Sequence, residues 1–368
     1  MPSDPRPTIP VSAPALDGRE AQYVQECLTS TWISSQGHFI DDFERAFAEF
    51  CGVEHAVATN NGTTALHLAL VALGVGAGDE VIVPTLTYIA SANAVTYCGA
   101  TPVFVDSDPV TMTMDPAGVA AAVTGRTKAI MPVHLYGHPA AMDRITALAR
   151  TRGLAVLEDA AQAVGATWQG RPIGGWGDAA CLSFYPTKNL GACGDAGMLL
   201  TTRDDVAEHV RRLRHHGDAG RYHHVELGYC TRLDELQAAL LRVKLRRLGE
   251  WETRRREIAA EYLEALAHLP LELPVERAGA RHVYHLFTVR HPQRDALVAA
   301  LTELGVGTAV HYPRAVPGQP LFGEDGQARW PEAWRAAHEV VSLPCFPELT
   351  AAEVAGVIDA VRRACKAL

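Results

Sequence analysis

The chain has 368 residues, of which 48% are hydrophobic and 20% are charged, and its formal net charge is −9 at pH 7. This length exceeds what a single hydrophobic core normally supports, so we expect more than one domain. The acidic balance argues against nucleic acid as the main partner. No apolar run reaches the ~18 residues that a membrane-spanning helix requires, and the amino terminus lacks the apolar segment of a secretory signal, so we expect a cytoplasmic protein without a membrane partner.

The cysteine and histidine patterns argue against a disulfide framework and a metal site. The eight cysteines are scattered and form no C-x-x-C pair. The pairs His215-His216 and His223-His224 come without any further ligand spacing, so a solvated loop is the better interpretation. We therefore expect no metal.

The amino-terminal part of the chain has helical periodicity. A first helix is expected at about Asp17 to Leu28, followed by a polar loop at 31–37. A second helix that packs into the core is predicted by four aromatic residues at helical spacing, Phe39, Phe43, Phe47 and Phe50.

From residue 55 onward, apolar strands alternate with helical stretches. Strands are expected at 55–59, 80–83, 102–105, 129–133 and 155–157, with helices at about 63–73, 87–98, 115–123 and 139–151. Short apolar strands separated by helices predict an α/β fold with a mostly parallel sheet that helices cover on both faces.

The carboxy-terminal third is expected to form a smaller unit. Strand-like segments around a lysine loop are followed by helices at about 203–214 and 233–266. After them come a strand at 284–289 and helices near 293–304, 331–338 and 350–366, which make up the smaller unit. The Gly- and Pro-rich residues 315–329 predict a mobile loop. We predict a large domain at 1–245, including the amino-terminal helical segment, and a small α/β domain at 246–368.

Lys188 lies in a tight loop between two apolar strands. Removing an ammonium group from water is costly, so a lysine in such a place is either paired or held neutral and reactive. The neutral amine is the form that makes Schiff bases with carbonyl compounds. A protruding loop with a solvated lysine is the alternative.

Further polar residues follow the strands, at the sheet edge where parallel α/β folds bind ligands. Asp159 follows one strand amid small residues and needs a cationic or protonated-nitrogen partner. Lys188 also follows a strand of what should be the same sheet, so the two side chains can lie close together. Gly62 and Thr63 begin a helix whose free N–H groups suit a phosphate, although an ordinary helix cap is possible. Tyr88 could stack on a flat ring or simply pack.

One ligand explains these features together, a phosphorylated pyridine aldehyde, which is pyridoxal 5'-phosphate. Lys188 would bind its aldehyde, and Gly62, Thr63 and Ser183 would bind its phosphate. Tyr88 would lie against the ring face, Asp159 would pair with the ring nitrogen, and Gln162 would contact the phenolic oxygen.

Four motifs in this order resemble the DegT/DnrJ/EryC1/StrS family of sugar aminotransferases: Asn61–Leu66, Glu158–Gln162, Ser183–Asn189 and Gly228–Ala239. The resemblance covers essentially the whole chain. It implies an aspartate-aminotransferase-like fold (fold type I of the pyridoxal-phosphate enzymes), a homodimer with shared active sites, and transfer of an amino group from L-glutamate, released as 2-oxoglutarate, to a nucleotide-linked keto sugar. By position it implies that Lys188 and Asp159 are the catalytic residues.

Two positions bear on this resemblance. Family members with histidine in place of the lysine are dehydratases, so Lys188 favours transamination. Cys230 stands where many relatives have an asparagine that reaches the cofactor phosphate across the dimer. A thiol is a poor hydrogen-bond donor, so another partner or a water is expected to replace that contact.

The resemblance leaves the substrate open. Residues 30–37 are similar to the perosamine synthases, which aminate a GDP-linked 4-keto sugar, whereas the lysine loop looks more like enzymes that aminate C-3 of dTDP-linked 3-keto-6-deoxyhexoses. We favour the dTDP-linked sugar because the lysine loop surrounds the reacting carbon. An aminocyclitol ketone is a further alternative. The residues expected to hold sugar or cosubstrate, each with a structural alternative, are Trp32, Ser34, Gly37, Tyr185, His311, Tyr312 and His134.

Two other classes of protein fit part of this pattern. A nicotinamide dehydrogenase would share the sheet pattern, but no G-x-G-x-x-G follows the first strand. A ligand-binding regulator built on the same fold is conceivable because fold does not fix function, and such a protein should lack a lysine-bound cofactor.

Overall fold

The computed structural model describes residues 8–16, 19–323 and 326–368. Three predictions fall partly on the remaining positions. Residues 1–7, on which no secretory signal is expected, and the expected helix start at Asp17 lie outside the described residues, as do positions 324–325 of the predicted loop at 315–329.

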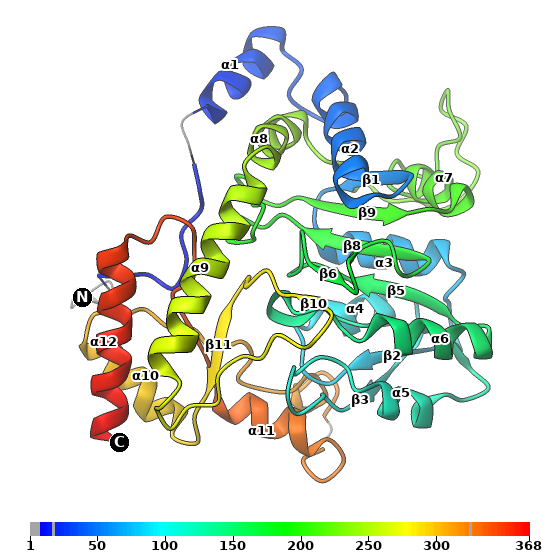
Figure 1. Ribbon diagram of the computed structural model, residues 1–368. Helices are drawn as coiled ribbons and strands as arrows, with labels where there is room; N and C mark the ends of the chain where they lie inside the picture. Colours follow the sequence, from blue (N-terminus) through cyan, green and yellow to red (C-terminus); the bar gives the residue numbers. More distant parts are fainter. Residues whose placement is uncertain (1–7, 17–18, 324–325) are drawn as a thin grey trace.

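A seven-stranded sheet forms the centre of the molecule (Figure 1), in the order β1-β9-β8-β5-β4-β2-β3. β9 runs antiparallel to both neighbours and the other strands are parallel, which confirms the mostly parallel sheet. β9 is reversed because it follows β8 through a loop instead of a crossover helix. The strands are β1 (His55–Thr59), β2 (Glu80–Pro84), β3 (Thr101–Val105), β4 (Thr127–Ile130), β5 (Ala155–Asp159), β8 (Ala179–Ser183) and β9 (Gly197–Thr201).

Helices cover both faces of this sheet, as predicted. Alternate residues of β1 show it directly, since Ala56 and Ala58 join one hydrophobic cluster and Val57 joins the other. The first cluster is closed by α2 (His38–Cys51), α5 (Pro116–Ala122), α6 (Met142–Arg152) and α8 (Glu235–Leu245). The second is closed by α3 (Gly62–Ala72), α4 (Ala90–Tyr97), α7 (Asp204–Leu213) and α11 (Pro331–Glu339).

The aromatic stripe of α2 is a core face for three of its four rings. Phe43 and Phe47 are fully buried and pack edge-on against Phe184 of the lysine loop. Phe39 is also buried, but Phe50 is 40% exposed, so the prediction that all four pack into the core is wrong at that position. Phe50 lies in the last turn of the helix, where it packs only partly, against Phe47.

The single helix predicted at 233–266 is two helices, α8 and α9 (Leu248–Leu266). The N–H of Arg247 bonds to the carbonyl of Lys244, three residues back, which interrupts the α-helical pattern. Figure 1 shows that α8 and α9 then differ in direction. α8 packs on the amino-terminal helices α1 (Glu20–Ser30) and α2, while α9 contributes to a third hydrophobic cluster.

This third cluster belongs mainly to the carboxy-terminal part of the chain. It is enclosed by α9, α10 (Arg294–Glu303), α12 (Ala351–Ala367) and the antiparallel pair β11 (Phe287–Arg290) and β12 (Val340–Leu343). The strand expected at 284–289 therefore begins three residues later. Ile9 and Ala13 from the amino-terminal segment also pack against this cluster. The division at residue 245 remains a prediction.

Smaller elements were not predicted. β6 (Thr167–Trp168), β7 (Arg171–Pro172) and β10 (Ala280–Arg281) form a three-stranded sheet beside the main one. The segment expected as a mobile loop begins with a short 3-10 helix, η2 (Val316–Gly318), and the N–H of Val316 bonds to the carbonyl of Thr85. Val316 is buried, so this end of the segment is packed against the large sheet.

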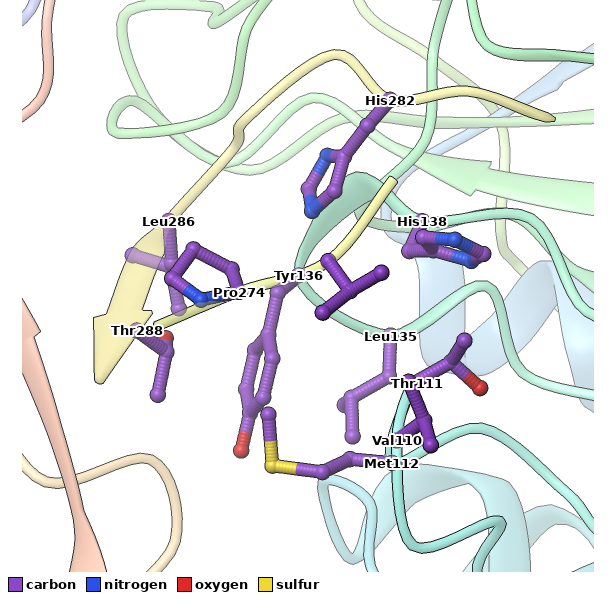
Figure 2. A pocket seen from close by; sticks show the side chains of 11 residues that line it. Val110, Thr111, Met112, Leu135, Tyr136, His138, Pro274, His282, Leu286 and Thr288 are labelled. Carbon is purple, nitrogen blue, oxygen red and sulfur yellow. The ribbon is translucent and has the colours of Figure 1, made fainter. Parts of the chain in front are cut away.

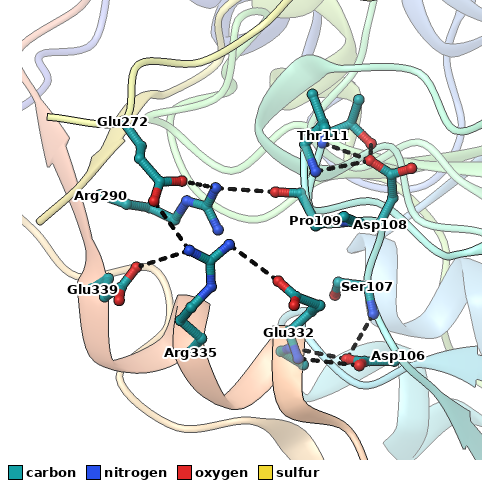
Figure 3. Close-up of polar contacts among 12 residues, drawn as sticks. Asp106, Ser107, Asp108, Pro109, Thr111, Glu272, Arg290, Glu332, Arg335 and Glu339 are labelled. Carbon is teal, nitrogen blue, oxygen red and sulfur yellow. Dashed lines mark hydrogen bonds and ion pairs between the residues drawn. The ribbon is translucent and has the colours of Figure 1, made fainter. Parts of the chain in front are cut away.

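A polar network joins α11 and β11 to the loop after β3, as Figure 3 shows. The carboxylate of Asp106 accepts hydrogen bonds from the N–H groups of Glu332 and Ala333, at 3.1 and 2.8 Å, and so caps α11. Arg290 donates to the carbonyl of Pro109 at 3.0 Å, and Arg335 pairs with Glu332. These contacts fix the carboxy-terminal part of the chain against the sheet edge at β3.

Glu235 connects the amino-terminal helices to α8. Its carboxylate is 1% exposed and accepts hydrogen bonds from the N–H groups of Phe39 and Ile40, at 2.8 and 3.0 Å, in the first turn of α2. Its own N–H bonds to the carbonyl of Ser34 at 2.6 Å. One residue therefore caps α2 and anchors the preceding loop.

We expect Glu235→Ala to lower the free energy of unfolding by about 2 kcal/mol, because two N–H groups lose a charged acceptor. Urea unfolding followed by circular dichroism measures the change. Glu49→Ala, which changes an exposed glutamate on the capped helix α2, is the control and should shift stability by less than ~0.5 kcal/mol. Equal stabilities of the two variants would contradict this role.

Candidate functional site

Side chains from four segments meet at the carboxyl edge of the sheet. Asp159 ends β5 and Ser183 ends β8, while α3 begins at Gly62 directly after β1. The loop after β8 carries Lys188, whose N–H bonds to the carbonyl of Tyr185 at 2.8 Å. This is the edge at which ligands bind in open α/β sheets.

Lys188 is partly buried and lies within electrostatic range of Asp159. Burial lowers the pKa of its amine to about 8, from 10.5, although the negative charge of Asp159 acts in the opposite direction. About a tenth of the amine is therefore neutral at pH 7, and the neutral amine is the form that attacks a carbonyl carbon. The solvated-lysine alternative is not supported.

Asp159 is 5% exposed, and both of its carboxylate oxygens accept a hydrogen bond. Ser91 Oγ donates to Oδ2 at 2.7 Å, and the N–H of Ala161 donates to Oδ1 at 3.2 Å. Burial raises the pKa of the Asp159 carboxyl, while Ser91, Ala161 and the charge of Lys188 lower it. Sequence reasoning missed Ser91, although it lies in the first turn of the helix after β2, a position equivalent to that of Gly62 after β1.

The side chain of Gln162 is held in one orientation. Its Oε1 accepts a hydrogen bond from the N–H of Tyr136 at 2.7 Å, so its Nε2 faces the other way and donates to the hydroxyl of Tyr312 at 3.0 Å. The ring of Tyr312 lies 5.8 Å from that of Tyr88, centroid to centroid. The structure thus brings together Gln162, Tyr312 and Tyr88, with Tyr136 as a supporting residue that the sequence did not reveal.

Gly62 lies where the start of α3 crosses the end of β8. A Cβ atom added to Gly62 would lie 2.9 Å from Ser183 Cβ and 3.1 Å from the carbonyl oxygen of Leu182. Asn61 caps the helix by accepting from the N–H of Thr64 at 2.8 Å. The N–H groups of Gly62 and Thr63 lie in the first turn, where a helix offers no internal acceptor, so they suit an anion.

His311 and Tyr185 also lie at this site. Burial lowers the pKa of His311 to about 4, with a contribution from the positive charge of Lys188, so its imidazole is neutral at physiological pH. Its Nδ1 lies 2.9 Å from Ser342 Oγ, and its carbonyl accepts a hydrogen bond from the hydroxyl of Tyr136. Tyr185 is 53% exposed and therefore available to a ligand.

His134 is not available to a ligand. It is fully buried, its Nε2 lies 3.1 Å from Glu158 Oε2, and its Nδ1 accepts from the N–H of Ala140. Glu158 also accepts from the N–H groups of Gly174 and Gly177, at 3.0 and 2.9 Å. The expectation that His134 holds substrate is wrong, because its buried imidazole is bonded to Glu158, the residue that fixes the loop after β7.

The loop at 31–37 lies apart from the Lys188 contacts just described. Trp32 is 54% exposed, and residues 31–36 line a shallow, open hollow. Ser34 is engaged through its carbonyl by Glu235. A Cβ atom at Gly37 would lie 2.2 Å from the Glu235 carboxylate, so the cap of α2 accounts for this glycine without a ligand.

Cys230 is exposed, and it contacts residues of the stretch 215–232. Its sulfur accepts a hydrogen bond from Arg232 Nη2 at 3.3 Å, and its backbone pairs with that of His215. Among the described residues of one chain, no hydrogen bond joins Cys230 to Gly62, Thr63 or Ser183.

Tyr136 also lines a separate narrow pocket, which Leu135, Leu286 and Met112 border as well (Figure 2). Two of its lining residues are His138 and His282, whose pKa values burial lowers, that of His138 to about 4. Both rings are therefore neutral, and the remaining walls are mostly apolar. Lys188 and Asp159 do not line this cavity.

The described part of the chain bears on two further expectations. None of its helices is long and apolar enough to cross a membrane. No group of three or more histidine, cysteine, aspartate or glutamate side chains in these residues could hold a metal ion.

The residues at the sheet edge fit pyridoxal phosphate. Gly62 leaves room for close approach of the helix start, Asp159 offers a buried acceptor, and Gln162 Nε2 is a donor of fixed direction. A sheet of this topology with a lysine, an aspartate and a helix start at one edge defines the class of pyridoxal-phosphate enzymes with the aspartate-aminotransferase-like fold. The model of the DegT/DnrJ/EryC1/StrS aminotransferase family matches residues 14–362, and the chain belongs to this family.

Curated relatives carry names with three different nucleotides. The chain is 49% identical to a UDP-N-acetyl-3-dehydro-alpha-D-glucosamine 3-aminotransferase of Acidithiobacillus ferrooxidans, with 87% of each protein covered. It is 46% identical to the GDP-perosamine synthase of Caulobacter vibrioides, covering 96% of this chain and 98% of that protein. It is 47% identical to the dTDP-3-amino-3,4,6-trideoxy-alpha-D-glucose transaminase of Streptomyces venezuelae, covering 89% and 87%.

Solved structures agree with the fold and the cofactor. DesV of S. venezuelae, in complex with a ketimine intermediate, matches with a TM-score of 0.91 and 46% identity over 94% of each chain. Other matching structures were solved with pyridoxal phosphate or its amine form bound. The chain is a sugar aminotransferase, and its cofactor is pyridoxal phosphate.

The lowered pKa of Lys188 predicts its reactivity in the apoenzyme. Reductive methylation of Lys188, followed by peptide mass spectrometry, should rise with pH through a midpoint near 8. Asp159→Asn should move this midpoint to lower pH, because it removes the charge that favours the ammonium form. The exposed Lys128 is the reference in the same sample, and identical pH profiles for the two lysines would contradict the prediction.

The close approach at Gly62 predicts a steric effect on the cofactor. Gly62→Ala should weaken binding of pyridoxal phosphate at least about tenfold, because the new Cβ pushes the start of α3 away from Ser183. Fluorescence titration of the apoenzyme measures the affinity. Gly76→Ala is the matched control, since no atom lies within 4 Å of its added Cβ. Unchanged affinity in Gly62→Ala would argue against a phosphate site at this helix start.

Proposed function

We propose that the protein transfers the amino group of L-glutamate to the keto group of a nucleotide-linked sugar, with a dTDP-linked 3-keto-6-deoxyhexose as the preferred acceptor. The observation that carries this proposal is the pair formed by buried Asp159 and Lys188, whose amine has a pKa of about 8, at the carboxyl edge of the sheet. A charged partner and a readily deprotonated amine are what amino-group transfer requires.

The bound cofactor would supply an electron sink for the carbanion that forms when the donor loses its α-proton. Lys188 Nζ would take that proton from the α-carbon of glutamate and return a proton to the sugar carbon that receives the amine. Asp159 would pair with the ring nitrogen and keep it protonated, and Gln162 Nε2 would donate to the phenolic oxygen. Gly62, Thr63 and Ser183 would bind the phosphate, and Tyr88 would face the ring.

Two half-reactions would share this one site. Glutamate enters first and 2-oxoglutarate leaves, and the keto sugar then accepts the amino group. Tyr185, His311 and Tyr312 would contact the sugar or the donor, because they lie beside Lys188 or Gln162. Trp32, Ser34 and Gly37 would contribute through the loop at 31–37, at the outer end of the substrate.

The preference for C-3 amination has two supports. The lysine loop resembles that of C-3 aminating enzymes, and two of the three relatives described above have names that specify a 3-amino product or a 3-aminotransferase. The C. vibrioides relative, a GDP-perosamine synthase, favours a second candidate, amination of a GDP-linked 4-keto-6-deoxymannose.

We also propose that the protein acts in the cytoplasm as a homodimer with shared active sites. The segment that carries Cys230 also exposes Tyr222 by 91% and Leu227 by 85%. Large exposed apolar side chains on one segment are typical of a protein interface. In such a dimer Cys230 would approach the partner's cofactor phosphate.

Lys188→Ala should abolish amine formation, because no other group replaces its proton transfer, while Lys128→Ala should keep wild-type activity. The assay uses dTDP- and GDP-linked 3-keto and 4-keto sugars and a keto-inositol with glutamate, and reads the amine by mass spectrometry. The dTDP-linked 3-keto sugar is expected to give the highest kcat/KM. Activity of Lys188→Ala would contradict the mechanism, and preference for another acceptor would contradict the substrate assignment alone.

A further inference from the structure

Ser91 is a fully buried hydroxyl in contact with Asp159. It lies in the first turn of α4, and its Oγ is 2.7 Å from Asp159 Oδ2. A serine hydroxyl has one proton, and an ionised carboxylate can only accept. The short bond to a carboxylate is charge-assisted and stronger than a bond to a neutral group, so the proton of Ser91 lies toward Asp159.

Thr87 extends this contact by one hydroxyl. Its Oγ1 lies 3.2 Å from Ser91 Oγ, and Thr87 is 3% exposed. Because the proton of Ser91 is committed to Asp159, the proton between the two hydroxyls comes from Thr87. The direction of donation is therefore from Thr87 to Ser91 to Asp159.

The chain of hydroxyls matters because Asp159 has little access to water. An ionised carboxylate loses several kcal/mol of solvation on burial unless hydrogen bonds or charges replace the water. Ser91 supplies the shorter of the two hydrogen bonds to this carboxylate. The other titratable groups among the described residues that act on Asp159, or on which it acts, are Lys188, His134, Cys181 and Tyr312.

We propose that Ser91, supported by Thr87, is a positioning residue that fixes the orientation of Asp159 and keeps it ionised for the cofactor. This inference rests on the proposed role of Asp159 as the partner of the ring nitrogen. Ser91 acts through Asp159 and needs no contact of its own with cofactor or substrate.

The test is the affinity of the full-length apoenzyme for pyridoxal phosphate, titrated by fluorescence from pH 5 to 9. Ser91→Ala should weaken binding about tenfold at neutral pH. Without the hydroxyl the pKa of Asp159 rises further, so the loss of affinity on acidification should begin at higher pH than in the wild type. Ser91→Thr keeps the hydroxyl and should restore both values.

Two further variants separate positioning from general damage. Thr87→Val leaves Ser91 in place and should shift affinity in the same direction by about two- to threefold. In an Asp159→Asn background, Ser91→Ala should change affinity less than twofold and should not move the pH profile. Thermal melting of each apoenzyme reports whether it folds.

The outcomes distinguish this inference from the proposed function. If Ser91→Ala keeps the wild-type affinity and pH profile, the proposed role of Ser91 is overturned. The role of Asp159 is then doubted only if Asp159→Asn also keeps the wild-type affinity. Equal losses from Ser91→Ala in the presence and absence of the Asp159 carboxylate would show a merely structural role. Wild-type binding and activity in Asp159→Asn would instead refute the role that the proposed function gives to Asp159.

Discussion

The buried carboxylate of Asp159 is the constraint on which the rest of the site depends. At 5% exposure it has exchanged water for a hydroxyl, one backbone N–H and the charge of Lys188. Each replacement comes from a different segment: the first turn of α4, the turn after β5 and the loop after β8. The folded arrangement of these segments is therefore what permits an ionised carboxylate to lie in the interior.

The two adjacent acids at the end of β5 have different roles, one structural and one at the candidate site. Successive side chains of a strand point to opposite faces, so Glu158 and Asp159 enter different surroundings. Glu158 binds buried His134 and the N–H groups of Gly174 and Gly177, which closes a loop. Asp159 faces the lysine loop instead, and only the second acid remains available to a ligand.

The same division applies to the glycines that the sequence singled out. Gly62 permits the start of α3 to approach Ser183, so its small size serves the site. Gly37 permits the approach of Glu235, which caps α2, so its small size serves the amino-terminal packing. Resemblance in the segment around Gly37 therefore carries less information about substrate than the residues beside Lys188 do.

The sequence by itself determined the chemistry and the layer pattern. Alternating apolar strands and helices predicted the sheet, and the types and order of Lys188, Asp159 and Gln162 pointed to the cofactor, because these signals are local or lie directly after strands. Tertiary structure alone decided the reversed β9, the break between α8 and α9, the burial of His134 and the contact of Ser91 with Asp159. That contact joins residues 68 positions apart, and the cap of α2 joins residues 196 positions apart. Such pairs depend on how whole elements pack, which no local pattern of residues records.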